Sequence, residues 1–320
     1  MRDFFRKAIG YLSFYKFNNL ANLKSEHKKI SIYLDKKIKD LKSNKSIRTR
    51  THIIFNKNVI DVLKKKKLIN FLRQPFIQKM FFTHNRLFIY NELQELRDDK
   101  KNWNKWKNLI NEDTVGDPIR YFLYLKSSGN RIRQVYHLKK FTDYADINLK
   151  SIKNIIEVGG GYGCMARIFS KINRSCNYLI FDTEEVNYLQ YYYLKLNKLN
   201  VKFETIKANF NLTKSIILLK KKLFNNTSNS LFIANWSISE MPLRLREKIL
   251  KYIFDVNYIL LSFQDKFENI NNIKYFKKMK KDLEKRNFNV EISPLKHYNN
   301  AIFNTNKHYY LFAKKKKLKC

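Results

Sequence analysis

The stretch "IIEVGGGYGCM" at residues 155–165 decides the fold of this 320-residue chain. It holds four of the seven glycines in the sequence, and an apolar run with one acid comes directly before them. After the glycines, Met165, Ile168, Phe169 and Ile172 form an apolar stripe at helical spacing. A strand, a glycine-rich turn and a helix, in this order, make the place where a doubly wound sheet binds nucleotides. Glycine lets the backbone approach a ligand, and the start of the helix offers N–H donors. We therefore expect a nucleotide-containing ligand at this turn.

Short apolar runs alternate with helical stretches from residue 154 onward. The runs cover residues 154–158, 177–182, 201–206, 230–235, 256–263, 288–293 and 308–313. Such alternation is typical of a parallel sheet with helices on both faces. Only a loop, residues 294–307, separates the last two runs, and a parallel return would need a longer crossover. The sequence predicts an α/β fold with a Rossmann-like, seven-stranded, mostly parallel sheet whose last strand is reversed.

The spacing of the glycines narrows the ligand. The pattern is E-x-G-x-G-x-G, formed by Glu157, Gly159, Gly161 and Gly163. The dinucleotide fingerprint would need a glycine or alanine where Cys164 stands, so a dehydrogenase is disfavoured. An acid two residues before the first glycine suits a ligand with a cationic amino-acid end. S-adenosyl-L-methionine is such a ligand, and we expect it as the cofactor.

Polar residues near the ends of the following strands extend this site. Asp182 ends the second run, where a carboxylate can accept hydrogen bonds from ribose hydroxyls; its alternative role is a helix N-cap paired with Glu185. Asn209 and Phe210 follow the third run and are expected to flank adenine, and Asn235 ends the fourth. Tyr162, inside the glycine turn, is expected to cover the cofactor. The expected cofactor-binding residues are Glu157, Gly159, Gly161, Tyr162, Gly163, Asp182, Asn209 and Asn235.

Several motifs resemble those of one enzyme family. The segments are "IIEVGGGYG", "YLIFDTEEVNYLQYYYL", "ANWSISEMP" and an upstream "VGDP…RQVYHLKKF" at 115–141. Together they resemble class I Rossmann-like methyltransferases and, more narrowly, the bacterial sugar O-methyltransferase family, over residues 110–312. The family often has Leu-Pro where this chain has Thr183-Glu184, and a small residue where it has Trp236. The resemblance implies methyl transfer from S-adenosyl-L-methionine to a sugar hydroxyl of a glycan or a nucleotide-activated sugar, in polysaccharide biosynthesis.

This resemblance also suggests how the chain is divided. Residues 1–110 are predicted to be a helical N-terminal region, because apolar residues recur there at three- and four-residue intervals. Gly116 and Pro118 mark a turn at the junction. Residues 111–313 are the expected methyltransferase domain, and residues 314–320 a basic tail. The helical region is expected either to cap the cleft or to serve in oligomerisation.

A sugar hydroxyl is a poor nucleophile, so a general base is expected. Glu240, after the fourth run, is the first candidate; its alternative role is to complement the helix dipole beside Pro242. His137 is the second candidate and His297 the third. Arg133 is either a contact for a phosphate or carboxylate of the acceptor or a solvated surface charge. No compact carboxylate cluster is visible, so no metal ligand is predicted.

The charge balance is strongly basic, with 65 Lys and Arg against 27 Asp and Glu, a formal net charge of +38. Such a charge usually favours nucleic acid or an anionic membrane surface. Here Lys, Asn, Ile, Phe and Tyr are abundant together while Gly and Pro are scarce, which is the pattern of A/T-rich codons. We therefore attribute the charge to base composition and do not favour nucleic acid as a partner.

The remaining composition indicates a cytoplasmic protein. Three cysteines, Cys164, Cys176 and Cys320, form no paired framework and fit a reducing compartment. No stretch reaches the ~20 apolar residues that a spanning helix needs, so no membrane span is expected. The N-terminus lacks the pattern of a signal peptide. The oligomeric state stays open.

Two other functions remain alternatives. An RNA ribose methyltransferase would use the basic charge, and a catalytically silent binding module would keep the fold without the reaction. Base methyltransferases are disfavoured, because amino-directed enzymes carry Asn/Asp-Pro-Pro-Tyr/Phe after the fourth strand, where this chain has Asn235-Trp236-Ser237-Ile238. No cysteine stands there to act as the nucleophile of a cytosine-C5 enzyme.

Overall fold

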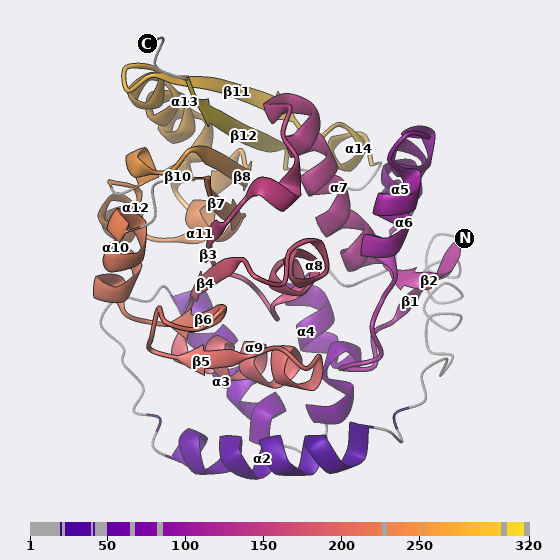
Figure 1. Cartoon of the computed structure of the whole chain (residues 1–320). Helices are drawn as coiled ribbons and strands as arrows, with labels where there is room; N and C mark the ends of the chain where they lie inside the picture. Colours follow the sequence, from indigo (N-terminus) through magenta and orange to yellow (C-terminus); the bar gives the residue numbers. More distant parts are fainter. Residues whose placement is uncertain are drawn as a thin grey trace.

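The computed structural model describes residues 20, 23–39, 41, 50–64, 68–81, 86–225, 229–251, 253–301 and 306–316 (Figure 1). Its centre is an eight-stranded sheet in the order β11-β12-β8-β7-β3-β4-β6-β5. The strands are β3 (Asn154–Val158), β4 (Asn177–Phe181), β5 (Val201–Phe203), β6 (Phe210–Thr213), β7 (Ser230–Asn235), β8 (Tyr258–Gln264), β11 (Phe288–Pro294) and β12 (His308–Lys315). β12 is antiparallel to both β11 and β8, and the other neighbouring pairs of this sheet are parallel. The predicted fold class and the reversed last strand are confirmed, but the sheet has eight strands instead of the seven expected.

The third predicted strand was wrong in detail. Residues 201–206 were expected to form one strand, but β5 ends at Phe203 and lies at the sheet edge. The place beside β4 belongs to β6, which pairs in parallel with both β4 and β5. All four residues of β6 are buried, including Asn211, whose side-chain amide donates to the carbonyl oxygen of Ala208 at 2.6 Å. Because β6 contains this polar residue, it is not an uninterrupted apolar run, and the hydrophobic pattern of the sequence does not predict it as a strand.

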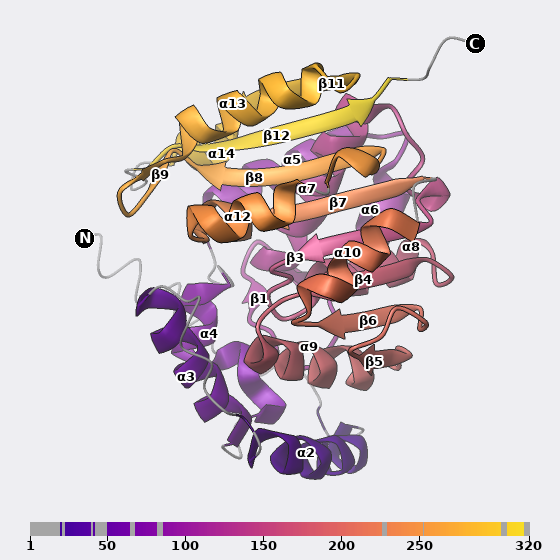
Figure 2. The same ribbon diagram turned by 90° about the vertical axis from the view of Figure 1, so that its left-hand side faces the viewer.

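The two faces of the sheet carry separate cores. Along β3, Ile155 lies in one core and Ile156 in the other, because successive side chains of a strand point to opposite faces. The first face is covered by α7 (Gly129–Ala145), α8 (Cys164–Ile172) and α9 (Glu184–Leu196). The second is covered by α10 (Ile216–Asn225), α12 (Leu243–Leu250) and α13 (Asn272–Glu284), which cross in front of the sheet in Figure 2. The short helices η3 (Leu149–Ser151), α11 (Ser237–Glu240), η4 (Ile253–Asp255) and α14 (Lys296–Asn299) connect strands and helices.

The front portion of the chain is helical in the residues that the structure describes. It contains α2 (Lys24–Lys39), α3 (Arg50–Lys64), η2 (Leu68–Arg73), α4 (Pro75–Met80), α5 (Phe88–Asp98) and α6 (Trp103–Ile110). Both α2 and α3 contact α9, and α5 contacts α7 (Figure 1). The apolar residues of these helices belong to the same core as the first face of the sheet. The front helices therefore lie directly on the layer that carries the glycine turn.

Smaller features complete the fold. Two-stranded ribbons form between β1 (Arg120–Tyr121) and β2 (Tyr124–Ser128), and between β9 (Lys266–Phe267) and β10 (Ile270–Asn271). The predicted start of the basic tail at 314 falls inside β12, because Lys314 and Lys315 pair with β11. Residues 317–320 lie outside the described residues. No helix in the described part of the chain is both long and apolar enough to cross a membrane.

Candidate functional site

The carboxyl ends of the parallel strands meet at one edge of the sheet, which we call the carboxyl edge. The glycine turn follows β3, Asp182 follows β4, and Asn235 is the last residue of β7. Open α/β sheets bind ligands outside the carboxyl ends of their strands, where the strand order reverses. Here that reversal lies at β3, between β4 and β7. The candidate site is therefore built around the glycine turn.

Three glycines of this turn adopt a conformation that other residues rarely take. Their φ angles are 72° at Gly159, 56° at Gly161 and 96° at Gly163. Space is also restricted, since a Cβ atom on Gly159 would lie 2.2 Å from the Cβ atom of Ser237. The glycines thus serve two purposes: they turn the chain sharply into α8, and they let the segment after β7 approach the turn.

Glu157 is buried beside this turn, with 4% of its surface exposed. The hydroxyl of Tyr178, on β4, donates to its Oε2 at 2.8 Å. Burial raises the pKa of Glu157 to about 8; the bond from Tyr178 acts against this rise, and the nearby Asp182 adds to it. A cation bound near Glu157 would favour its charged form and reverse the effect of burial.

Asp182 is held in place by three hydrogen bonds. Its Oδ1 accepts from the backbone N–H of Thr183 at 2.8 Å, and its Oδ2 accepts from Nε2 of Gln190 at 2.9 Å. The backbone N–H of Gly160 also donates to this carboxylate. Burial raises the pKa of Asp182 to about 7, although these hydrogen bonds act against the rise. The N-cap of α9 is Thr183, so the alternative role of Asp182 as a helix cap does not apply.

Gln190 is a site residue that sequence reasoning missed. Its Nε2 donates both to Asp182 and to the carbonyl oxygen of Gly161, at 2.9 Å each, so one amide joins the two halves of the site. A signal was present, because Gln190 interrupts the apolar stripe of α9 between Val186 and Tyr193. A polar residue on the buried stripe of a helix needs a hydrogen-bond partner.

Asn209 does not belong to the site. It precedes β6 instead of following a strand, so it lies at the amino edge of the sheet, opposite the carboxyl edge. There its Nδ2 donates to the carbonyl oxygen of Arg174 at 3.1 Å. Phe210 stacks on Tyr178 in the core, with ring centroids 5.8 Å apart. At the carboxyl edge the end of β6 is Thr213, whose carbonyl oxygen accepts from the backbone N–H of Asp182 at 3.0 Å.

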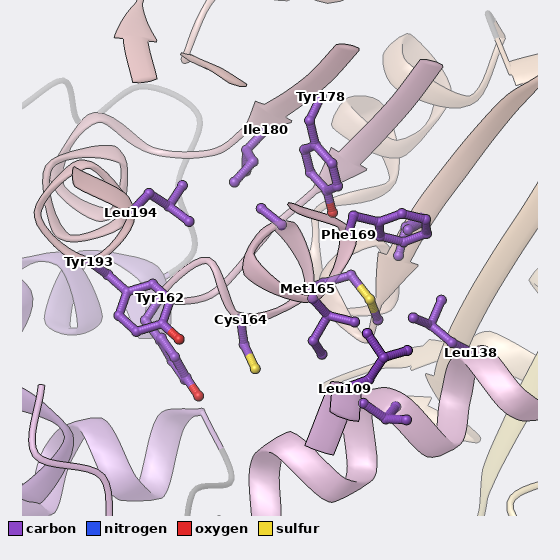
Figure 3. Close-up of a cluster of buried hydrophobic side chains, with 14 of the residues drawn as sticks. Leu109, Leu138, Tyr162, Cys164, Met165, Phe169, Tyr178, Ile180, Tyr193 and Leu194 are labelled. Atoms are coloured by element: carbon purple, nitrogen blue, oxygen red, sulfur yellow. The ribbon is translucent and has the colours of Figure 1, made fainter. Parts of the chain in front are cut away.

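Tyr162 points into the protein instead of covering a ligand. Figure 3 shows its ring against Tyr193, and the two ring centroids lie 5.0 Å apart. Its hydroxyl accepts a hydrogen bond from Nδ2 of Asn130, on α7, at 2.9 Å. The predicted covering role is thus wrong in this conformation, because the aromatic core beneath the turn takes up the ring. Tyr162 instead anchors the turn to α7.

The same helix spans the carboxyl edge. One turn after Asn130, Gln134 accepts from Nδ2 of Asn235 at 3.2 Å. A further turn along, Nδ1 of His137 lies 2.6 Å from the hydroxyl of Tyr310, on β12. Residues 130, 134 and 137 lie on one face of a helix, because they are three or four positions apart. Helix α7 therefore connects the glycine turn, the end of β7 and the last strand.

His137 and Arg133 are buried, contrary to a role at an exposed acceptor site. His137 is 0% exposed, and burial holds its pKa well below the usual range, so it is neutral. The guanidinium of Arg133 lies over the ring of Trp236, 4.5 Å from its centroid, and over Tyr298 at 4.7 Å. His297 pairs with Glu95 at 2.5 Å. These positions leave Glu240 as the candidate base.

Glu240 ends α11, directly after β7 and the turn at Trp236. Its Oε1 accepts from Nε2 of Gln264 at 3.3 Å. Burial raises the pKa of Glu240 to about 7, while Gln264 and Arg246 act against this rise. A carboxylate with a pKa near neutrality is suited to accept a proton at physiological pH. In the described residues, no group of three His, Cys, Asp or Glu side chains is placed to hold a metal.

Trp236, which directly follows β7, has an unusual backbone conformation. Its φ is 63°, a conformation that costs about 1–3 kcal/mol for a bulky residue. The indole N–H donates to Nδ1 of His308 at 2.7 Å, and the backbone N–H donates to the carbonyl oxygen of Ser262 at 2.7 Å. The next residue, Ser237, donates to the carbonyl oxygen of Val158. The strained turn at Trp236 thus places Ser237 in contact with the glycine turn.

A shallow pocket of about 780 Å³ lies at the amino edge of the sheet, and we call it the amino-edge pocket. Lys150, Lys153 and Arg174 line it together with asparagine and serine side chains, and no acid is among its lining residues. Because the amino and carboxyl edges are opposite ends of the strands, this pocket is separate from the candidate site.

No protein-family model and no curated protein matches this chain. Solved structures of similar fold include the methyltransferase domain of bacterial CtHen1-C, with 15% identity and a TM-score of 0.42 over 57% of this chain and 99% of that one. Another is precorrin-6y C5,15-methyltransferase from Geobacter metallireducens GS-15, with 14% identity and a TM-score of 0.38 over 57% and 87%. A third is phosphoethanolamine N-methyltransferase 2 from Haemonchus contortus with S-adenosyl-L-methionine, with 10% identity and a TM-score of 0.39 over 58% and 52%. Likenesses this distant carry no argument about activity.

Proposed function

We propose that this protein is an S-adenosyl-L-methionine-dependent O-methyltransferase that acts on a sugar hydroxyl of a glycan or a nucleotide-activated sugar. The observation that carries the proposal is the convergence of two carboxyl groups, those of the buried Glu157 and the half-buried Asp182, on one glycine turn. Glu157 and Asp182 come from neighbouring strands and flank Gly160: Asp182 accepts its N–H, and a Cβ atom on Gly160 would lie 3.0 Å from Oε2 of Glu157.

The residues at the carboxyl edge fit this cofactor. Glu157 suits the cationic methionine end, because a buried acid with a raised pKa gains most from a positive neighbour. Asp182 is oriented by Gln190 to accept from the ribose hydroxyls. The glycine backbone leaves room for close approach between them. When bound, the cofactor supplies an activated methyl group, and the protein supplies alignment and a base.

Glu240 is the base in this proposal. It follows β7, whose last residue Asn235 is fixed by Gln134, so it lies beyond the strand next to the glycine turn. A general base of this kind contributes about 10²–10⁴-fold to the rate. The choice of a sugar acceptor rests on the sequence resemblance, chiefly on "ANWSISEMP" and the helix after Asp182.

One observation favours a second candidate, an RNA ribose methyltransferase. The amino-edge pocket groups three cations without an acid, on a protein of net charge +38. Phosphate groups are attracted to such surfaces regardless of sequence. The pocket lies at the far end of the strands from Asp182, so it could serve RNA only as an auxiliary contact, and we rank this function second.

Isothermal titration of the purified protein with S-adenosyl-L-methionine and S-adenosylhomocysteine tests the cofactor. We expect saturable binding of both ligands and a large loss with Asp182→Ala. Transfer of a labelled methyl group to nucleotide sugars, oligosaccharides or RNA then tests the acceptor. Absence of binding to either cofactor form would refute the proposal, and methylation of RNA alone would replace the acceptor. Binding without transfer to any acceptor would favour the silent module.

A further inference from the structure

A residue of the front helical region reaches the site at Asp182. Asn56, on α3, is 2% exposed, and its Oδ1 accepts from the hydroxyl of Thr183 at 3.1 Å. Thr183 directly follows Asp182 in the sequence. The other end of the same amide, Nδ2, is buried and has no hydrogen-bond partner among the described residues. Helix α3 thus places an unused donor beside the carboxyl edge.

Two unused acceptors lie on the helix that follows Asp182. Both come from α9: Oδ1 of Asn187 and Oε1 of Gln190 are buried and have no hydrogen-bond partner in the described part of the chain. Their amide nitrogens are engaged, since Gln190 donates to the Asp182 carboxylate at 2.9 Å and Asn187 to its carbonyl oxygen at 3.4 Å. One donor and two acceptors therefore belong to side chains that contact Asp182 or the next residue, Thr183.

This arrangement is unfavourable unless something fills it. A buried polar atom without a partner costs about 1–3 kcal/mol, and most such atoms in folded proteins are paired. A ligand with both acceptors and donors, and without charge at this point, would satisfy all three.

We propose that Asn56, Asn187 and Gln190 bind the nucleoside part of the cofactor, with α3 supplying the donor. The inference rests on the proposed function and narrows it to the purine base and ribose. Adenine is the matching chemistry, because it offers ring-nitrogen acceptors next to an exocyclic amino donor, the pair of groups that amide side chains recognise. Binding would also tie α3 to α9, so the front region serves as a cap on the nucleoside side.

The test compares Asn56→Leu with Asn211→Leu. Asn211 is also buried, but its Nδ2 donates to the carbonyl oxygen of Ala208 and its Oδ1 accepts from the N–H of the same residue. We expect Asn56→Leu to weaken the binding of S-adenosylhomocysteine and of 5′-methylthioadenosine by the same factor, about tenfold. The melting temperature of the free protein should change little. Asn211→Leu should lower the melting temperature and leave both dissociation constants unchanged.

Two outcomes separate the inference from the function on which it rests. If the wild-type protein binds neither ligand, the proposed function fails. If the wild type binds and Asn56→Leu binds equally well, only the inference is overturned. Should Asn56→Leu fail to fold, Asn56→Asp decides: it keeps the shape and the acceptor for Thr183 but replaces the donor by an oxygen, so we expect at least the same loss of affinity.

Discussion

Replacing Glu157 by Gln should stabilise the protein at pH 8 and weaken its ligand binding at the same time. In the folded protein burial raises the pKa of Glu157 from an ordinary 4.5 to about 8. Between these values the folded state holds a proton that the unfolded state has released. Stability from this group is therefore complete below about pH 4.5 and is lost as the pH rises to about 8. Glutamine resembles the protonated acid and does not titrate.

The size of the effect follows from the same two values. A difference of about 3.5 pH units at about 1.4 kcal/mol each corresponds to an upper bound of about 5 kcal/mol at pH 8. For a domain of this size 1 kcal/mol shifts the melting temperature by roughly 2–4 °C. We expect Glu157→Gln to melt about 5–15 °C above the wild type at pH 8, and within a few degrees of it at pH 5.

Thermal unfolding followed by circular dichroism from pH 5 to 9 measures this directly. Glu284→Gln, which removes a surface carboxylate on α13, is the control and should follow the wild type. Titration at pH 8 should show that Glu157→Gln binds S-adenosylhomocysteine at least tenfold more weakly, because the carboxylate that we propose to face its ammonium group is gone. Parallel melting curves for Glu157→Gln and the wild type across the pH range would refute the reasoning.

Three further outcomes are expected. Glu240→Gln should leave S-adenosyl-L-methionine binding near wild type and reduce turnover at least tenfold; unchanged turnover would make Glu240 only a residue at a helix start. Trp236→Phe and Trp106→Phe each remove a 2.7 Å indole hydrogen bond of a buried tryptophan and should lower the melting temperature alike. Only Trp236→Phe should weaken the binding of S-adenosylhomocysteine, by about five- to tenfold. Equal affinities would show that the strained turn is purely structural. Changing the three cations of the amino-edge pocket to Gln should leave methyl transfer to a sugar acceptor intact; a loss measured with RNA alone would favour the second candidate function.

Much of the fold follows from patterns a few residues long. Strands β3 and β7 have the predicted bounds, because uninterrupted apolar runs between polar turns have few other places to be buried. The glycine turn was equally clear, since positive φ angles leave few alternatives to glycine. Glu157 and Asp182 were placed at one edge from sequence order alone, because parallel strands end on the same side of a sheet.

Only the tertiary structure decided which polar residues meet at that edge. Asn56 contacts Thr183 across 127 positions and His137 contacts Tyr310 across 173, and no local pattern encodes such pairs. Asn209 was misplaced because the third strand beside β4 is β6, which begins after Asn209. β6 is buried although its sequence is not an uninterrupted apolar run. The sequence by itself determined the layers of the sheet, the glycine turn and its two acids. Packing between distant elements decided that Tyr162, His137 and Arg133 are core residues and that α3 reaches the site, because a helix buries whichever face its neighbours cover.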